Sequence, residues 1–152
     1  MSVLQKYQDV PDGLNALSKE VVDSIFQVHL ELGPGFLEKI YEECLCQEFS
    51  DRKIPFLRQV PVNMIYKGRQ IPADFRLDLV VDQRVLIELK AVGQILSVHE
   101  AQMHSYLKIS GLPLGFLVNF NVALIKDGLH RYVPKHLRTF GSSGEKKSES
   151  GI

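Results

Sequence analysis

The chain has 152 residues, and 18 Lys and Arg residues balance 18 Asp and Glu residues, so the formal net charge is zero. This length favours a single domain that buries a substantial core without disulfides or metal ions. The fractions of 45% hydrophobic and 24% charged residues are typical of an ordinary globular protein. Zero net charge argues against binding of polyanions over the whole surface, because such binding depends on Lys and Arg contacts with phosphates. It does not exclude a local basic groove.

The sequence also bears on the compartment. No apolar run approaches the roughly 20 residues that a membrane-spanning helix needs, and the first residues, MSVLQKYQDVPDG, lack the apolar segment of a signal peptide. Cys44 and Cys46 lie two apart in a predicted helix and therefore point in different directions, which disfavours a bridge between them. We therefore expect reduced thiols in a soluble, cytoplasmic protein that does not engage a membrane.

The first predicted elements are an arm and two helices. Residues 1–16 are expected to form a loosely docked arm, and Ser18 is placed to cap an amphipathic helix. Gly33-Pro34-Gly35 ends that helix, since a glycine followed by proline terminates helices. A second helix is predicted at about 36–50, and it is expected to bury Leu37, Tyr41 and Cys44.

The second half alternates between strand and helix patterns. Residues 56–66 are rich in β-branched and aromatic side chains and predict a strand, and Lys67-Gly68 marks the turn after it. The further predicted elements are strands at 76–81 and 85–90, a helix at 97–110 that Ser97 caps and Gly111 ends, and strands at 114–120 and 129–133.

This order predicts an α/β fold. Antiparallel strands followed by a crossover helix and another strand give a mixed central sheet with helices on its faces. We therefore expect an N-terminal arm at 1–16, a single domain at 17–140 and a polar, disordered tail at 141–152.

Three charged residues interrupt the apolar strands at 76–81 and 85–90, namely Asp78, Glu88 and Lys90. Burial of a charge is costly unless the charge is paired or binds a metal. Because side chains alternate along a strand, Glu88 and Lys90 project to the same side. A two-residue loop between the strands would put Asp78 opposite Ile87, on the other face, whereas an odd-length loop or a bulge would put it opposite Glu88. We predict the second arrangement.

Two carboxylates beside a lysine suit a divalent cation. Their hard oxygen atoms match Mg²⁺ or Mn²⁺, which polarise a phosphoryl oxygen and activate an attacking water. Lys90 would orient that water or stabilise the developing charge. The alternative interpretation is that Lys90 only neutralises the two acids at a strand end.

These residues resemble the D…(D/E)xK signature of the PD-(D/E)XK nuclease superfamily, with Asp78 ten residues before Glu88-Leu89-Lys90. The segment from Gly35 to Tyr41 matches the GxxExxY motif of a family of small proteins within it, and Val28-His29 and Asn119-Phe120 are similar too. The resemblance covers about Leu17 to Val133. It implies the core of that superfamily, preceded here by one extra helix.

The resemblance also implies roles for individual residues. Asp78 and Glu88 would bind Mg²⁺ or Mn²⁺ with the backbone carbonyl of Leu89, and Lys90 would be the catalytic lysine. The remaining implied residues are Glu38, as an additional acid at the metal, and Gln102 with Tyr106, as a QxxxY pair that lines the active site or contacts DNA.

Several of these residues also have plainer interpretations. Glu38 suits the positive end of its helix as a surface acid, and Gln102 suits a polar surface patch. Tyr41 is expected to be a packed core aromatic, and His29 a buried histidine with a hydrogen-bond partner.

The sequence thus predicts a Mg²⁺-dependent nuclease that hydrolyses phosphodiester bonds in DNA or RNA. The alternative is a nuclease-fold module that binds nucleic acid or a protein partner with little or no catalysis. The sequence leaves a homodimer, the substrate and the choice between endo and exo cleavage open.

Overall fold

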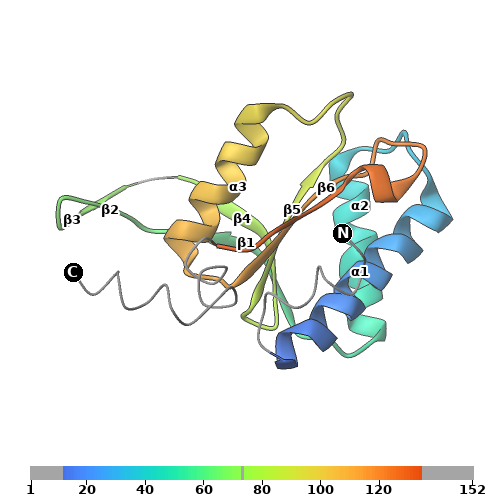
Figure 1. The fold of residues 1–152 in the computed structure, drawn as a ribbon, viewed down its shortest axis with the longest axis horizontal. Coiled ribbons are helices and arrows are strands. Elements are labelled where there is room, and N and C mark those ends of the chain that lie inside the picture. The colour runs from blue at the N-terminus through green and yellow to red at the C-terminus, as the bar shows by residue number, and fades with distance from the viewer. Residues whose placement is uncertain (1–11, 73, 135–152) are drawn as a thin grey trace, which may run out of the picture.

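The computed structural model describes residues 12–72 and 74–134 (Figure 1). Residues 1–11 of the expected arm and the whole of the expected tail at 141–152 lie outside the described residues, so the arm over these residues, the end of the domain at 140 and the tail stay predictions. The elements are α1 (Asp12–Leu32), α2 (Glu38–Asp51), β1 (Phe56–Pro61), β2 (Met64–Tyr66), β3 (Arg69–Ile71), β4 (Arg76–Val81), β5 (Val85–Lys90), α3 (Ser97–Ser110), β6 (Leu114–Asn119), a 3-10 turn (Ile125–Asp127) and β7 (Leu129–Tyr132).

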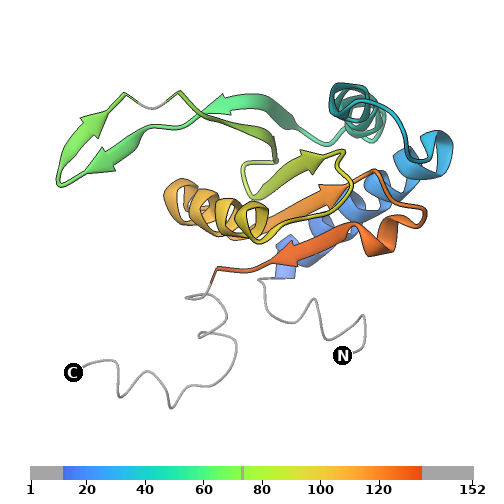
Figure 2. The same cartoon turned by 90° about the horizontal axis from the view of Figure 1, so that it is seen from above.

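The central sheet has five strands in the order β1-β4-β5-β6-β7. Strands β1, β4 and β5 form an antiparallel meander, α3 crosses over to β6, which is parallel to β5, and β7 is antiparallel to β6. The mixed α/β fold predicted from the sequence is therefore confirmed. Strands β2 and β3 form a separate hairpin that projects away from the sheet (Figures 1 and 2).

Helices cover both faces of the sheet, with α1 and α2 on one face and α3 on the other (Figure 2). We call the two cores the α1/α2 core and the α3 core. In β5 the odd-numbered residues belong to the α1/α2 core, since Val85, Ile87 and Leu89 are each 0% exposed. The α3 core consists of Leu77, Val80, Leu86, Met103, Leu107 and Leu117.

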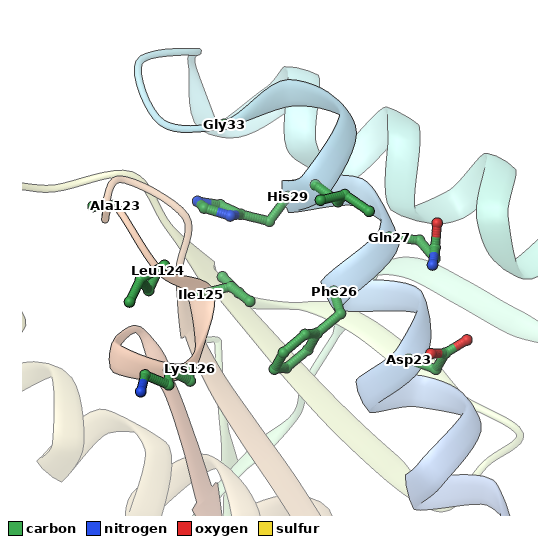
Figure 3. A pocket seen from close by; sticks show the side chains of 10 residues that line it. Asp23, Phe26, Gln27, His29, Gly33, Ala123, Leu124, Ile125 and Lys126 are labelled. Atoms are coloured by element: carbon green, nitrogen blue, oxygen red, sulfur yellow. The ribbon is translucent and has the colours of Figure 1, made fainter.

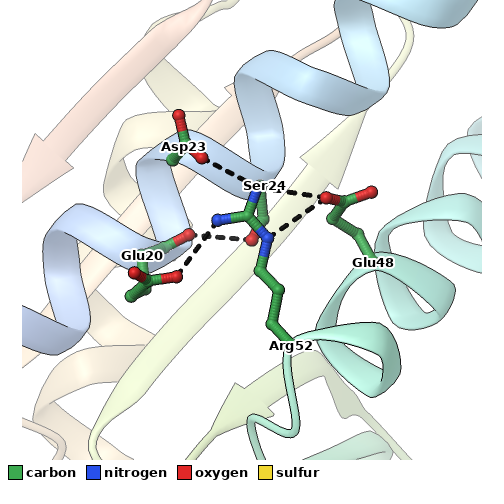
Figure 4. A network of polar contacts seen from close by, with 5 residues as sticks. All are labelled: Glu20, Asp23, Ser24, Glu48 and Arg52. Carbon is green, nitrogen blue, oxygen red and sulfur yellow. Dashed lines mark hydrogen bonds and ion pairs between the residues drawn. The ribbon is translucent and has the colours of Figure 1, made fainter.

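Arg52 fixes the two N-terminal helices to each other (Figure 4). Its guanidinium lies 3.1 Å from Glu20 and 2.8 Å from Asp23, both on α1, and 3.0 Å from Glu48 on α2. Helix α1 ends before Gly33, whose φ of +65° suits glycine and whose N–H donates to the His29 carbonyl at 2.7 Å. The stop predicted at Gly33 is confirmed, and it positions the start of α2.

The N-terminal part differs from the prediction in its first helix. Helix α1 begins at Asp12, so residues 12–16 are helical and not part of an arm, and Leu14 is only 2% exposed. The predicted cap Ser18 lies inside the helix and is buried. The cause is the apolar spacing, because Leu14 and Leu17 extend the buried face of α1 by one turn towards the N-terminus.

Three further expectations were wrong. Leu37 is 78% exposed, because it precedes α2 in an extended conformation and so leaves the helical face that Tyr41 occupies. Ser97 is the first helical residue of α3 and not its cap; Leu96 holds the cap position. The strand expected at 56–66 divides after Pro61, where the chain leaves the sheet for the β2–β3 hairpin. The turn at Lys67-Gly68 is confirmed within that hairpin.

Both cysteines are free thiols, as predicted. None of the helices within the described part of the chain is long and apolar enough to cross a membrane.

Candidate active site

The loop between β4 and β5 has an odd number of residues. Val81 pairs with Val85 and Leu79 with Ile87, so residues 82–84 form the loop. The same register continued by one step puts Asp78 opposite Glu88, on the face of the sheet shared with Leu86. The predicted juxtaposition of the two acids is therefore confirmed.

The two acidic side chains accept hydrogen bonds from main-chain N–H groups of β4 and β5. Asp78 Oδ2 accepts the N–H of Leu89 at 2.8 Å, and Glu88 Oε1 accepts the N–H of Asp78 at 3.2 Å. The regular ladder ends at Leu79 and Ile87. The strands thus separate at the two acids, and the carboxylates link them across the opening.

The carbonyl of Leu89 faces the same opening. In a strand the N–H and C=O of one residue point to the same neighbour, and the N–H of Leu89 points to Asp78. The carbonyl of the next residue, Lys90, points the other way, since it accepts the N–H of Phe120 beyond β6 at 3.0 Å. Two carboxylates and one carbonyl therefore converge on the space between β4 and β5.

Glu88 is 6% exposed. Burial raises the pKa of its carboxyl well above the usual range for glutamate, and the neighbouring Asp78 raises this pKa further. Lys90, half-buried at the end of β5, acts in the opposite direction. Burial and the neighbouring carboxylate thus both favour the protonated form of Glu88.

Glu38 reaches the site from the first residue of α2. Partial desolvation raises the pKa of its carboxyl, Asp78 raises this pKa further, and Lys90 lowers it. Within residues 12–72 and 74–134, no group of three or more His, Cys, Asp or Glu side chains has an arrangement that holds a metal by itself. Glu38 thus contributes its charge to the site but does not form a three-acid cluster with Asp78 and Glu88.

Helix α3 brings Tyr106 to the site more closely than Gln102. Tyr106 stacks on Phe75 with ring centroids 5.1 Å apart, and desolvation followed by the charges of Glu88 and Asp78 raises the pKa of its hydroxyl. Gln102 lies on the same face one turn earlier and is exposed, without a side-chain hydrogen bond to another described residue.

Asn119 supports the chain beyond Lys90. Its side chain is 2% exposed, accepts the N–H of Val92 at 3.1 Å and donates to the carbonyl of Val92 at 3.0 Å. The sequence indicated Asn119 only through the family resemblance, because a lone asparagine after an apolar strand carries no signal of its own.

Tyr41 has the structural role expected of it. It is 0% exposed, stacks on Phe120 with centroids 4.4 Å apart and donates its hydroxyl to the Gly33 carbonyl at 2.6 Å. The same oxygen accepts the N–H of Phe36 at 3.2 Å. The Gly35–Tyr41 segment therefore fixes the turn that places Glu38. His29 is also buried and satisfied, because Nε2 donates to the Val122 carbonyl at 2.8 Å.

Two cavities lie beside the N-terminal helices, one against α2 and one against α1. One of about 470 Å³ adjoins the site and is lined by Glu38, Lys39, Glu42, Glu43, Arg58 and Gln59. The other, of about 570 Å³, lies between α1 and the connection from β6 to β7 (Figure 3). It includes Phe26, His29 and Leu124 but none of the predicted site residues.

Comparison with known proteins adds one finding. The family model of the PD-(D/E)XK nuclease superfamily matches residues 15–132. Neither the comparison with curated proteins nor the comparison with solved structures gives a match.

Proposed function

The chain belongs to the PD-(D/E)XK nuclease superfamily, and on this basis we propose that it is a metal-dependent nuclease that hydrolyses phosphodiester bonds in DNA or RNA. The observation that carries the proposal is the pair of Asp78 and Glu88, which links β4 and β5 where their ladder ends. Membership of the GxxExxY family is part of the same proposal.

The donor atoms fit Mg²⁺ or Mn²⁺. Both ions prefer carboxylate and carbonyl oxygens and retain several waters, which suits a site with two carboxylates and the Leu89 carbonyl. The raised pKa of Glu88 supports this fit, since it marks a buried pair of acids with too little positive charge nearby. A bound divalent cation would supply Lewis-acid activation of water and phosphate.

The other residues then have distinct roles. Lys90 projects from the end of β5 beside Glu88 and would orient the attacking water or stabilise charge on the phosphate. Glu38 would bind a water of the metal, which fits an acid near the pair but outside a three-acid cluster. Gln102 and Tyr106 on α3 would contact the nucleic acid beside the reacting phosphate.

The test is a cleavage screen of the full chain on single-stranded, duplex and branched DNA and on RNA, with Mg²⁺, Mn²⁺ or EDTA. We expect metal-dependent cleavage that Glu88→Gln and Lys90→Ala each reduce about 10²–10³-fold. Lys108→Ala, an exposed lysine in the last turn of α3, is the matched control and retains activity. Circular dichroism establishes that each variant folds.

The outcomes of this screen distinguish the nuclease from the binding module. If the wild-type chain cleaves none of these substrates with either metal, the nuclease proposal fails. Retention on nucleic acid without turnover would favour the binding module instead. A cytoplasmic location and a homodimer stay predictions, which fractionation and sedimentation of the full chain test.

A further inference from the structure

Strand β1 changes face at Gln59. Before this residue β1 faces α2, since Phe56 packs on the α1/α2 core and Arg58 bonds to Glu42. After it Val60 packs on the α3 core, although residues 56, 58 and 60 of a regular strand share one face. Strand β4 changes face at the opposing position, because Leu79 belongs to the α1/α2 core and Leu77 to the α3 core.

The cause lies in the backbone of Gln59, whose φ is +50°. This left-handed conformation is uncommon for residues other than glycine and costs of order 1 kcal/mol. The buried carboxylate of Glu42 holds it, since Glu42 Oε1 accepts from Gln59 Nε2 at 2.8 Å and Oε2 from Arg58 Nη2 at 2.8 Å. Adjacent side chains of a regular strand point to opposite faces. Arg58 and Gln59 can therefore both bind the carboxylate of Glu42 only because the strand is distorted between them.

The distortion frees the N–H of Asp78. Arg58 pairs with Leu79 and Val60 with Leu77, whereas Gln59 and Asp78 between them do not pair. In a regular ladder the N–H of Asp78 would donate to the Gln59 carbonyl, as the N–H of Asp82 at the same parity donates to the Pro55 carbonyl at 2.7 Å.

Both groups have other partners in this structure. The N–H of Asp78 donates to Glu88 Oε1, and the Gln59 carbonyl accepts from Arg76 Nη1 at 3.4 Å. The conformation of Gln59 is thus coupled to the contact between the two acids.

From this coupling we propose that Gln59, held by Glu42, is a positioning residue that turns Asp78 away from β1 and towards Glu88 and Leu89. The inference rests on the proposed function for its link to metal binding. Its structural part, the choice of partner for the N–H of Asp78, stands on the hydrogen bonds alone.

Two substitutions at Gln59 separate positioning from general support of the fold. Gln59→Val favours an extended backbone, because a β-branched residue strongly disfavours positive φ. Gln59→Gly adopts positive φ readily although it loses the side-chain hydrogen bond. Lys67→Val is the matched control, since Lys67 also has a positive φ, of +49°, but lies in the β2–β3 turn.

The measurements are Mn²⁺ affinity by calorimetry and thermal melting of the metal-free protein. We expect Gln59→Val to lower Mn²⁺ affinity about 10–100-fold, as is usual for groups that orient metal ligands. Gln59→Gly should retain most of the affinity, and Lys67→Val should change the melting temperature alone. If Gln59→Val does not fold, Glu42→Ala takes its place, with the expectation of the same loss.

A second readout does not depend on the metal. When Gln59 is present, Glu88→Gln should shift the ¹⁵N and amide-proton resonances of Asp78, because the N–H of Asp78 donates to Glu88. In the Gln59→Val background this shift should disappear. If both backgrounds respond alike and bind Mn²⁺ equally, Gln59 does not position the site. If the wild-type chain binds no Mn²⁺ while the resonances behave as expected, the metal-dependent function fails and the positioning role of Gln59 remains.

Discussion

The carboxylate of Asp78 accepts the backbone N–H of Leu89 at 2.8 Å, in place of the main-chain acceptor that a regular sheet would provide. One residue of the signature thereby holds the backbone of another. The carbonyl of Leu89, which points to the same side as its N–H, is oriented by the same contact. Asp78 and the Glu88-Leu89-Lys90 segment, which are separated along the chain, are therefore joined by a hydrogen bond between β4 and β5.

Asp78→Asn should separate folding from metal binding. The amide oxygen of asparagine can still accept the Leu89 N–H, so we expect the metal-free protein to be as stable as wild type or more stable. Mn²⁺ affinity should fall by more than about 100-fold, since even partners outside the ligand set contribute 10–100-fold. Calorimetry and thermal melting measure the two effects. A large loss of stability with unchanged affinity would show that Asp78 is only structural.

The stability of the metal-free protein should depend on pH through Glu88. The pKa of this carboxyl is higher in the folded chain than in the unfolded chain, so between these two values the folded state binds more protons. The free energy of unfolding contributed by this group is therefore present at low pH and is lost as the pH rises towards the raised pKa, by up to about 1.4 kcal/mol per pH unit.

Denaturant melts in EDTA at pH 5.5, 7 and 8.5 test this dependence. Glu88→Gln, which stays neutral, should show a flatter profile, and Mn²⁺ should raise the stability of the wild-type chain most at high pH. Parallel profiles for wild type and Glu88→Gln would contradict the raised pKa.

Tyr41→Phe should destabilise the protein by about 1–3 kcal/mol, because it removes two hydrogen bonds, one to the half-buried carbonyl of Gly33 and one from the N–H of Phe36. Chemical denaturation measures this loss. Tyr66→Phe removes the same atom from an exposed side chain and should have little effect. Equal effects of the two substitutions would mean that the hydroxyl of Tyr41 does not fix the turn before Glu38.

Arg52→Ala should lower stability by about 1 kcal/mol, since its three carboxylate partners are partly exposed and each such pair contributes little. The loss should shrink in 1 M NaCl, where screening weakens these pairs. Arg84→Ala removes a single pair with Asp82 and should change stability by less than about 0.5 kcal/mol. A loss at Arg52 that is insensitive to salt would point to packing of its side chain instead.

The strands at 76–81 and 85–90 were predictable to the residue and the end of the helix at Ser110 closely, because their apolar patterns are strong and glycine or turn residues bound them. The meeting of Asp78 with Glu88 was predictable from strand alternation once an odd loop was assumed. The hydrogen bonds of these two carboxylates to backbone groups were not predictable, since such bonds form only where the regular pairing of β4 and β5 ends. The left-handed backbone conformation of Gln59 was not predictable either, because glutamine has no preference for positive φ.

Capping serines and helix ends were less predictable. Ser18 and Ser97 both have the residue type of a cap, but in each case the helix begins earlier than the serine requires. Leu37 fits the spacing of Tyr41 on a helical face, and only the helix start at Glu38 excludes it. The preference of serine for the cap position is thus overruled when packing determines the first residue of a helix.

The distortion at Gln59 has a consequence for the protein in concentrated solution. Strand β1 is an edge of the sheet, and a flat edge strand offers unpaired N–H and C=O groups to another copy of the chain. The twist at Gln59, together with the missing N–H of Pro61, interrupts that edge. The feature that orients an acid in the interior of the sheet thus also protects its rim against intermolecular β-pairing and aggregation.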